Sequence, residues 1–137
     1  MDFDGKGREE LIDKMTWEMK TDRPIYLQLI EQIKRRIVSG EFPAGSQLPP
    51  VRTLAEQAAV NPNTMQKAFS ELEREGLVFT QRTSGRFITE DKDMIEQLKT
   101  MLAQEVITEF FLQMNGLGFT KEDAIHLIES TAKEQKI

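Results

Sequence analysis

Cysteine is absent from this chain of 137 residues, and histidine occurs once. Without cysteine there can be no disulfide, thiolate metal site or cysteine nucleophile, and His126 has no second histidine with which to share a metal ion. No apolar run approaches the roughly 18 residues needed to span a bilayer. Residues 1–4 lack the basic and then apolar layout of a signal peptide. We therefore expect a soluble cytoplasmic protein that has no metal, cofactor or membrane partner.

Acidic residues exceed basic ones, and the formal net charge is −5, but the excess is confined to the two ends. Residues 1–22 hold four basic and seven acidic side chains, and residues 91–137 hold five and nine. Residues 23–90 hold nine basic and seven acidic side chains, a balance of +2. Exposed charges more than about 10 Å apart are largely screened at ordinary salt, so the local balance matters. A mildly basic centre is compatible with specific DNA binding and unfavourable to strong non-specific binding.

Start and stop signals divide the centre of the chain into three helices. Pro24 suits the start of a helix and Gly40 suits its C-terminal cap, so we predict a first helix between them. Apolar residues at helical spacing predict a short helix over residues 51–58 and a third helix over residues 62–75. Asn61 is a good N-cap for the third helix. The short turn between the last two helices indicates a helix-turn-helix.

Two strands are expected after the third helix, over residues 77–81 and 86–89, with hairpin-turn residues between them. Three helices followed by a two-stranded hairpin form a winged helix-turn-helix. The exposed face of the third helix carries short hydrogen-bonding groups and cations, which can contact base edges or phosphates in a DNA major groove. These residues are Asn63, Gln66, Lys67, Ser70 and Arg74.

The order of these residues is also that of a known family. The segments that carry the resemblance are residues 24–29, 40–49, 52–55, 60–64 and 68–77. Over residues 23–89 the chain strongly resembles the DNA-binding domain of GntR-family bacterial transcription regulators. It departs from the family pattern at Pro50, where a small polar residue is usual, and at Ser84-Gly85-Arg86, where the wing usually has Gly-x-Gly.

The resemblance implies roles for individual side chains. Arg52 matches an arginine that contacts the phosphate backbone or a base, and Ser84 and Gly85 match the wing tip that enters the minor groove. Helical geometry adds Lys67, and the hairpin adds two cations. The remaining positions that match DNA-contacting residues of the family are Asn61, Asn63, Thr64 and Gln66. The two cations of the hairpin are Arg82 and Arg86.

Simpler interpretations of the same residues stay open. Asn61, Asn63 and Thr64 could serve only as helix caps. Arg52 could form a surface ion pair with Glu56, four residues on, and the hairpin arginines could be solvated charges.

Residues 91–137 predict two further helices, the first over residues 93–114. Thr120 and Asp123 resemble a capping box that starts the second helix. Two helices cannot enclose a core, so we expect a homodimer. The expected dimerisation residues lie on one stripe: Leu98, Leu102, Val106, Phe110 and Met114.

The small C-terminal segment resembles the short YtrA-type branch of the family, in which the helices mainly dimerise. A drug-sized ligand needs a pocket of about 300 Å³ or more, which we expect two helices to form only at a dimer interface. A small-molecule effector therefore stays open. Two-fold symmetry implies a palindromic operator.

We therefore divide the chain into an N-terminal extension (1–22), a winged helix-turn-helix domain (23–90) and a two-helix dimerisation segment (91–137). In the extension, Leu11, Ile12 and Met15 could form a helical turn, and Trp17 and Met19 alternate as in a short strand.

The leading hypothesis is a dimeric, sequence-specific DNA-binding regulator. The resemblance implies a repressor of a small operon, such as transporter genes together with its own gene. The alternatives are a winged-helix protein-interaction module without DNA binding and a metabolite-responsive regulator with a ligand site at the dimer interface. An enzyme is not expected, because the chain is too short for the aminotransferase-like domain of some GntR relatives.

Overall fold

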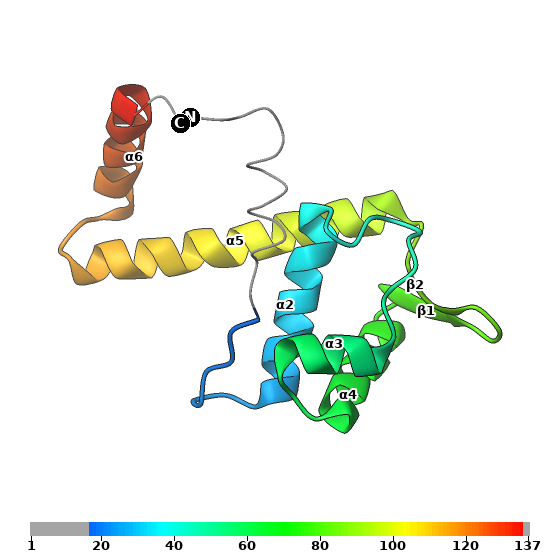
Figure 1. Cartoon of the computed structure of the whole chain (residues 1–137). Coiled ribbons are helices and arrows are strands. Elements are labelled where there is room, and N and C mark those ends of the chain that lie inside the picture. Colours follow the sequence, from blue (N-terminus) through cyan, green and yellow to red (C-terminus); the bar gives the residue numbers. More distant parts are fainter. Residues whose placement is uncertain (1–16, 136–137) are drawn as a thin grey trace. The chain divides into compact units, whose positions relative to one another are not determined.

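The computed structural model describes residues 17–135, which form a mainly α-helical chain with one β-hairpin (Figure 1). The chain divides into two units, one ending at Leu98 and the other beginning at Lys99; we call their described parts the winged unit (17–98) and the C-terminal unit (99–135). The expected helical turn near residues 11–15 lies outside the described residues. The elements are α2 (Ile25–Ser39), α3 (Val51–Ala58), α4 (Pro62–Arg74), β1 (Val78–Gln81), β2 (Gly85–Ile88), α5 (Lys92–Gly116) and α6 (Lys121–Gln135).

The helix ends predicted from the sequence are confirmed. Gly40 caps α2 in the left-handed conformation, with φ of 87°, and its N–H bonds to the carbonyl of Ile37. The side chain of Asn61 accepts the N–H of Asn63 at 2.8 Å and so caps α4. Between α3 and α4, Ala59 also has a left-handed φ of 55°, which is costly for a residue with a Cβ. That conformation turns the chain sharply enough for α4 to begin directly after α3.

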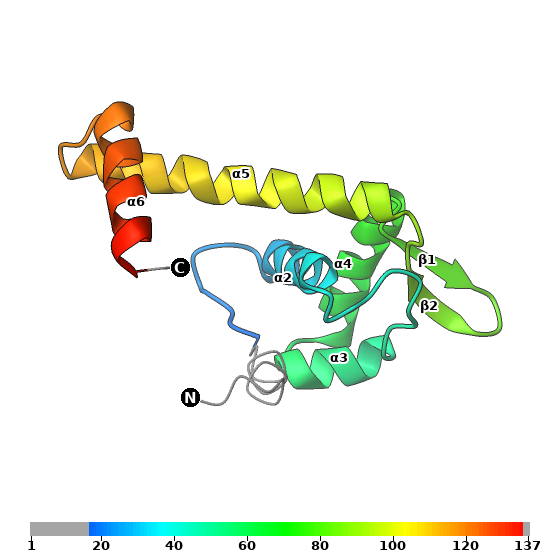
Figure 2. The same ribbon diagram turned by 90° about the horizontal axis from the view of Figure 1, so that it is seen from above.

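Helix α4 occupies the centre of the winged unit. It packs against α2, α3 and β1, and both views show it lying among them (Figures 1 and 2). Phe69 and Leu72 of α4 are fully buried, together with Leu29 and Ile33 of α2. Burying a large apolar side chain contributes about 1.5–3 kcal/mol, so this shared core fixes the orientation of α4.

One face of the hairpin is buried, and the other carries a pair of stacked aromatic rings. Val78 pairs with Ile88, and both are buried against the helices. On the other face the rings of Phe79 and Phe87 stack with centroids 5.6 Å apart. The segment before α3 adds further rungs, since the N–H of Leu48 bonds to a β2 carbonyl at 2.8 Å. Strand β2 is therefore hydrogen-bonded on both sides, to β1 and to the chain that leads into α3.

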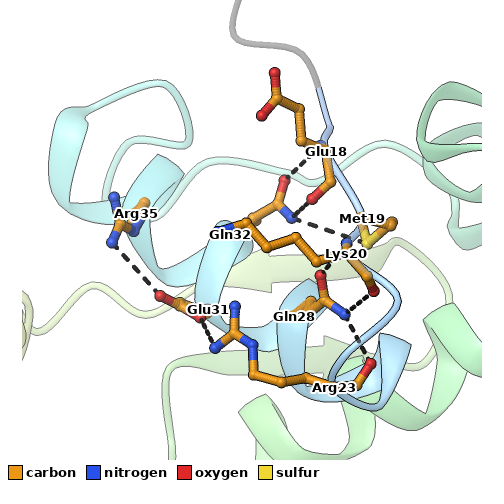
Figure 3. Close-up of polar contacts among 8 residues, drawn as sticks. All are labelled: Glu18, Met19, Lys20, Arg23, Gln28, Glu31, Gln32 and Arg35. Atoms are coloured by element: carbon orange, nitrogen blue, oxygen red, sulfur yellow. Dashed lines mark hydrogen bonds and ion pairs between the residues drawn. The ribbon is translucent and has the colours of Figure 1, made fainter.

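Residues 17–23, which we call the strap, form no helix or strand: residues 17–20 lie alongside α2, and residues 21–23 bend into its start (Figure 3). The side-chain amide of Gln28 accepts the N–H of Lys20 at 2.6 Å and donates to the carbonyls of Lys20 and Arg23 at 2.7 and 2.8 Å. One turn later, Gln32 bonds in the same way to the N–H and carbonyl of Glu18, at 3.3 and 2.7 Å. Residues two positions apart on an extended chain face the same side, as do residues four positions apart on a helix. Glu18 and Lys20 can therefore meet Gln32 and Gln28 at the same time.

The short strand expected at Trp17 and Met19 is wrong. Within residues 17–135 these two residues belong to no strand, because the two glutamines supply the hydrogen bonds that a neighbouring strand would have supplied. Trp17 instead lies over the guanidinium of Arg36, with 3.7 Å between the guanidinium carbon and the ring centroid. Arg36 is only 3% exposed, and its Nε lies 3.0 Å from a carboxylate oxygen of Glu41. Burial lowers the pKa of Arg36, an effect that the charge of Glu41 opposes.

The C-terminal unit begins within α5 and includes α6. The predicted capping box is confirmed: Thr120 Oγ1 accepts the N–H of Asp123 at 3.1 Å, and Asp123 Oδ2 accepts the N–H of Thr120 at 3.3 Å. Helix α5 runs to Gly116, slightly past its expected end, and the chain turns at Gly118 with φ of 97°. None of the described helices is long and apolar enough to cross a membrane.

Replacing Gln28 with Leu should release the strap. The backbone groups of Lys20 would lose their partners, and the free energy of unfolding should fall by about 1–3 kcal/mol. Because Trp17 is the only tryptophan of the chain, acrylamide quenching of its fluorescence reports the release directly. Quenching should increase in Gln28→Leu and stay unchanged in Gln57→Leu, which alters an exposed glutamine of α3. Equal quenching in both variants would contradict the clamping role of Gln28.

Candidate nucleic-acid interface

The first two turns of α4 present most of the side chains predicted to read DNA. Asn61, Asn63, Gln66 and Lys67 are exposed, and Thr64 is half-buried. The capping interpretation holds for Asn61, whose side-chain oxygen is occupied by the N–H of Asn63. The amide nitrogen of Gln66 lies 3.4 Å from the hydroxyl of Ser70, which keeps it on the helix surface. The geometry leaves the amides of Asn63 and Gln66 accessible to a partner.

Lys67 has a partner that sequence reasoning missed. Its ammonium lies 3.7 Å from the centroid of the Tyr26 ring, in the first turn of α2. A cation over an aromatic face is held by the negative face of the ring. No sequence signal predicted this pair, because forty-one positions separate the two residues along the chain.

Arg52 lies in the first turn of α3, where its side chain is exposed. The alternative ion pair with Glu56 is not formed; among residues 17–135 Arg52 has no carboxylate within ion-pair distance. Helix α3 packs against α4, so Arg52 belongs to the same helix-turn-helix as the residues of α4. The guanidinium is therefore available to an external anion.

The wing tip carries Arg82, Ser84 and Gly85, all exposed. Gly85 has φ of 111°, a conformation that L side chains rarely adopt, so the turn requires glycine. Gln47, which the sequence did not single out, donates from its side-chain amide to the carbonyl of Ser84. A Cβ at Gly85 would lie 3.1 Å from that amide nitrogen. Gln47 thus fixes the shape of the wing tip from the segment before α3.

Arg86 is placed differently from the other predicted contact residues. Its Nε lies 3.0 Å from an oxygen of Glu73, and its guanidinium lies 5.4 Å from the ring centroid of Phe69. The hydroxyl of Thr80 on β1 donates to the same carboxylate. Glu73 therefore joins both strands of the wing to α4. Arg86 helps to hold the wing in place, and contact between its half-buried side chain and DNA stays a prediction.

The cations of the winged unit fall into two groups. Arg23, Lys34, Arg35, Arg36, Arg74 and Arg86 all lie within 3.5 Å of a carboxylate oxygen. In the part of the chain that the structure describes, the cations of the winged unit with no such partner are Lys20, Arg52, Lys67, Arg82 and Lys92. Lys20 is on the strap and Lys92 begins α5, whereas the other three belong to the helix-turn-helix and the wing tip. Three of these five cations of the winged unit thus lie on the predicted DNA-reading elements.

The residues expected to dimerise are not equivalent in the structure. Leu98 is buried in the winged unit, whereas Val106 of the C-terminal unit is 57% exposed. Phe110 and Met114 line a cavity of about 430 Å³ together with Leu127 and other residues of α6. We expected a pocket of this size only between two subunits. In the structure, a single chain forms a hollow of that volume between α5 and α6.

Comparison with known proteins identifies the family. The model of the gntR family of bacterial regulatory proteins matches residues 25–88. Over 113 residues the chain is 43% identical to the HTH-type transcriptional regulator YhcF of Bacillus subtilis, an alignment that covers 82% of this chain and 93% of YhcF. The chain belongs to the GntR family. It is a DNA-binding transcriptional regulator with a winged helix-turn-helix, and the relatives named here are regulators, not enzymes.

Two further comparisons extend beyond the DNA-binding domain of this GntR regulator. It is 33% identical over 118 residues to the HTH-type transcriptional repressor YtrA of Bacillus subtilis, covering 85% of this chain and 91% of YtrA. A solved structure of a GntR-family transcriptional regulator from Listeria monocytogenes superposes with a TM-score of 0.74 at 38% identity, covering 82% of this chain and 98% of that one. The resemblance to short, YtrA-like regulators is confirmed.

Replacing Glu73 with Ala should loosen the wing, because Arg86 and Thr80 would both lose their shared acceptor. Hydrogen bonds to charged groups contribute about 1.5–3 kcal/mol, so the free energy of unfolding should fall by roughly that amount in urea titrations. Glu71→Ala is the matched control, since it removes the same residue type from α4 but breaks only the exposed pair with Arg74. That pair should contribute less than about 1 kcal/mol. Equal losses in the two variants would show that Glu73 does not brace the wing.

Proposed function

We propose that this GntR regulator is a homodimer that binds a palindromic operator and represses transcription in the cytoplasm, where bacterial DNA lies. The observation that supports it most directly is the distribution of unpaired cations. Three cations without a carboxylate partner among the described residues, Arg52, Lys67 and Arg82, come from α3, α4 and the wing tip. Phosphates are the natural partners for cations in such an arrangement.

The proposed contacts divide by the chemistry of the side chains. Asn63 and Gln66 can form paired hydrogen bonds with adenine, so we assign them to base reading in the major groove together with Thr64. Arg52 and Lys67 contact phosphates. Asn61 contributes its remaining amide group next to its capping role. At the wing, we assign contacts with the minor groove to Arg82, Ser84 and Gly85, and we give Arg86 a supporting role through Glu73.

Dimerisation is proposed from the surface of the C-terminal unit. Large apolar side chains are exposed there on α5 and in the turn after it, among them Met101 (55%), Val106 (57%), Ile107 (51%) and Leu112 (64%) of α5 and Leu117 (73%) of the turn. At the 100° step of an α-helix, those of α5 lie on several sides of its axis, an arrangement typical of a buried helix. A second copy of the chain would cover them and would set two winged helix-turn-helix domains, the DNA-reading heads of the dimer, at a fixed spacing.

Repression is proposed because YtrA, which is similar over most of its length, is a repressor. An operon of transporter genes, with the regulator's own gene, is the target that we propose from the resemblance. A second candidate function adds a metabolite effector. The cavity between α5 and α6 is within the size range of ligand pockets, and its lining is apolar except for Thr131. An effector bound there would act through the C-terminal unit on the spacing of the two heads.

Selection of bound duplexes from a random pool tests the proposed specificity, and a palindrome is the expected product. On the selected duplex, Arg52→Ala should raise the Kd about tenfold and should lower the slope of log K against log salt by about one, as the loss of one phosphate contact requires. Arg74→Ala is the matched control, because Arg74 is exposed on α4 but already paired with Glu71. Unchanged binding by Arg52→Ala in a fluorescence-anisotropy titration would exclude the assigned role.

Val106→Glu tests the dimer in the full chain. A charge placed at this exposed apolar position would be buried on association, so sedimentation equilibrium should show a shift from dimer to monomer. Gln104→Glu adds the same charge at an exposed polar position of α5 and should leave the dimer intact. A dimer of unchanged stability in Val106→Glu would place the interface elsewhere.

A further inference from the structure

We propose that Tyr26 is a positioning residue of the DNA interface, whose ring holds the ammonium of Lys67 where a phosphate binds it. This inference rests on the proposed DNA-contact role of Lys67. It assigns a function to a residue of α2, a helix that supplies none of the contacts proposed above.

The contact itself is close. Lys67 Nζ lies 3.7 Å from the ring centroid of Tyr26, well inside the roughly 6 Å at which a cation is attracted to an aromatic face. Lys67 is exposed and Tyr26 is half-buried, so a partly covered ring lies against an exposed lysine side chain. The pair joins α2 to α4, which pack directly against each other.

The first turn of α2, which carries Tyr26, is bonded to the strap. Gln28, two residues after Tyr26, is 2% exposed and bonds to Lys20 and Arg23 (Figure 3). Gln28 also bonds through its backbone N–H to the carbonyl of Pro24. These bonds hold the backbone of the first turn of α2, from which the Tyr26 ring reaches Lys67.

The arrangement favours DNA binding for an entropic reason. A lysine side chain has four rotatable bonds and loses much of its conformational entropy when a partner fixes its ammonium. A ring that already restricts these rotamers reduces the loss on binding. The aromatic face occupies one side of the ammonium and carries no full charge, so the ammonium keeps donors for a phosphate. A carboxylate in place of the ring would neutralise the cation, as Glu71 does for Arg74.

Lys67 differs in this respect from the other cations that lack a carboxylate. Within the described part of the chain, the cations placed over aromatic rings are Arg36, Lys67 and Arg86, and both arginines also have carboxylate partners. Lys67 therefore combines a held position with an unneutralised charge. That combination suits a preorganised phosphate contact.

A double-mutant cycle on the full chain tests the proposal, with the duplex recovered in the selection experiment as the probe. The variants are Tyr26→Leu, Tyr26→Phe, Lys67→Met and Tyr26→Leu combined with Lys67→Met. We expect Tyr26→Leu to raise the Kd about two- to fivefold, the range of an exposed cation–π contact. Tyr26→Phe keeps the ring and should bind as the unaltered protein does. In the Lys67→Met background, Tyr26→Leu should have no further effect.

A measurement without DNA checks the contact itself. After reductive methylation of the lysines, the NMR signal of the Lys67 methyl groups should be shifted by the ring current of Tyr26, and Lys67→Met identifies that signal. The shift should persist in Tyr26→Phe and disappear in Tyr26→Leu. A Lys67 signal that is equal in the unaltered protein and in Tyr26→Leu would overturn the proposal.

The remaining outcomes separate this proposal from the proposed function. If the unaltered protein binds no duplex, both are overturned. If Lys67→Met weakens binding while Tyr26→Leu leaves it unchanged or tightens it, only the role of Tyr26 is overturned. If Tyr26→Leu weakens binding equally with and without Lys67, its effect is a general loss of structure, and the positioning role is again overturned.

Discussion

The burial of one face of α4 is the constraint on which the rest of the winged unit depends. Met65, Ala68, Phe69 and Leu72 are all 0% exposed. Because an α-helix repeats every 3.6 residues, burying this face turns Asn63, Gln66 and Lys67 towards solvent. The cap at Asn61 and the left-handed Ala59 fix where the helix begins, so the core determines both the direction and the register of the side chains that we propose to contact DNA.

Internal ion pairs explain how an acidic chain can present a basic reading head. Carboxylates such as Glu71 and Glu73 pair with Arg74 and Arg86 and so reduce the positive charge that these two arginines present to a partner. Charges separated by more than a Debye length contribute little at ordinary salt, so the field at Arg52 or Lys67 depends mainly on the charges close to them. This arrangement limits non-specific attraction to DNA, because only a few cations remain for phosphates, and leaves discrimination to hydrogen bonds with the bases.

The sequence predicted features that depend on neighbours along the chain. The helices, their caps, the hairpin and the capping box at Thr120 follow from periodicity and from residues a few positions apart. Contacts between distant residues were not predictable in the same way: Gln47 with the wing tip, Glu73 with both strands and Lys67 with Tyr26 each require the fold first. The strap illustrates the difference, because the alternation at Trp17 and Met19 did indicate an extended chain, but only the position of Gln28 and Gln32 decides what that chain bonds to.

The winged unit encloses an apolar core of its own, whereas the C-terminal unit leaves much of its apolar surface exposed. Two helices leave apolar side chains such as Val106 and Leu112 in water and a cavity between Phe110 and α6. Association with a second copy would remove both costs, and would also supply what the reading head lacks. One helix-turn-helix contacts only a few base pairs, whereas two heads on one rigid connection must both match before either contributes fully. In the proposed dimer, the exposed apolar surface and the small number of proposed base-reading side chains would have one explanation, because specificity would come from pairing two subunits.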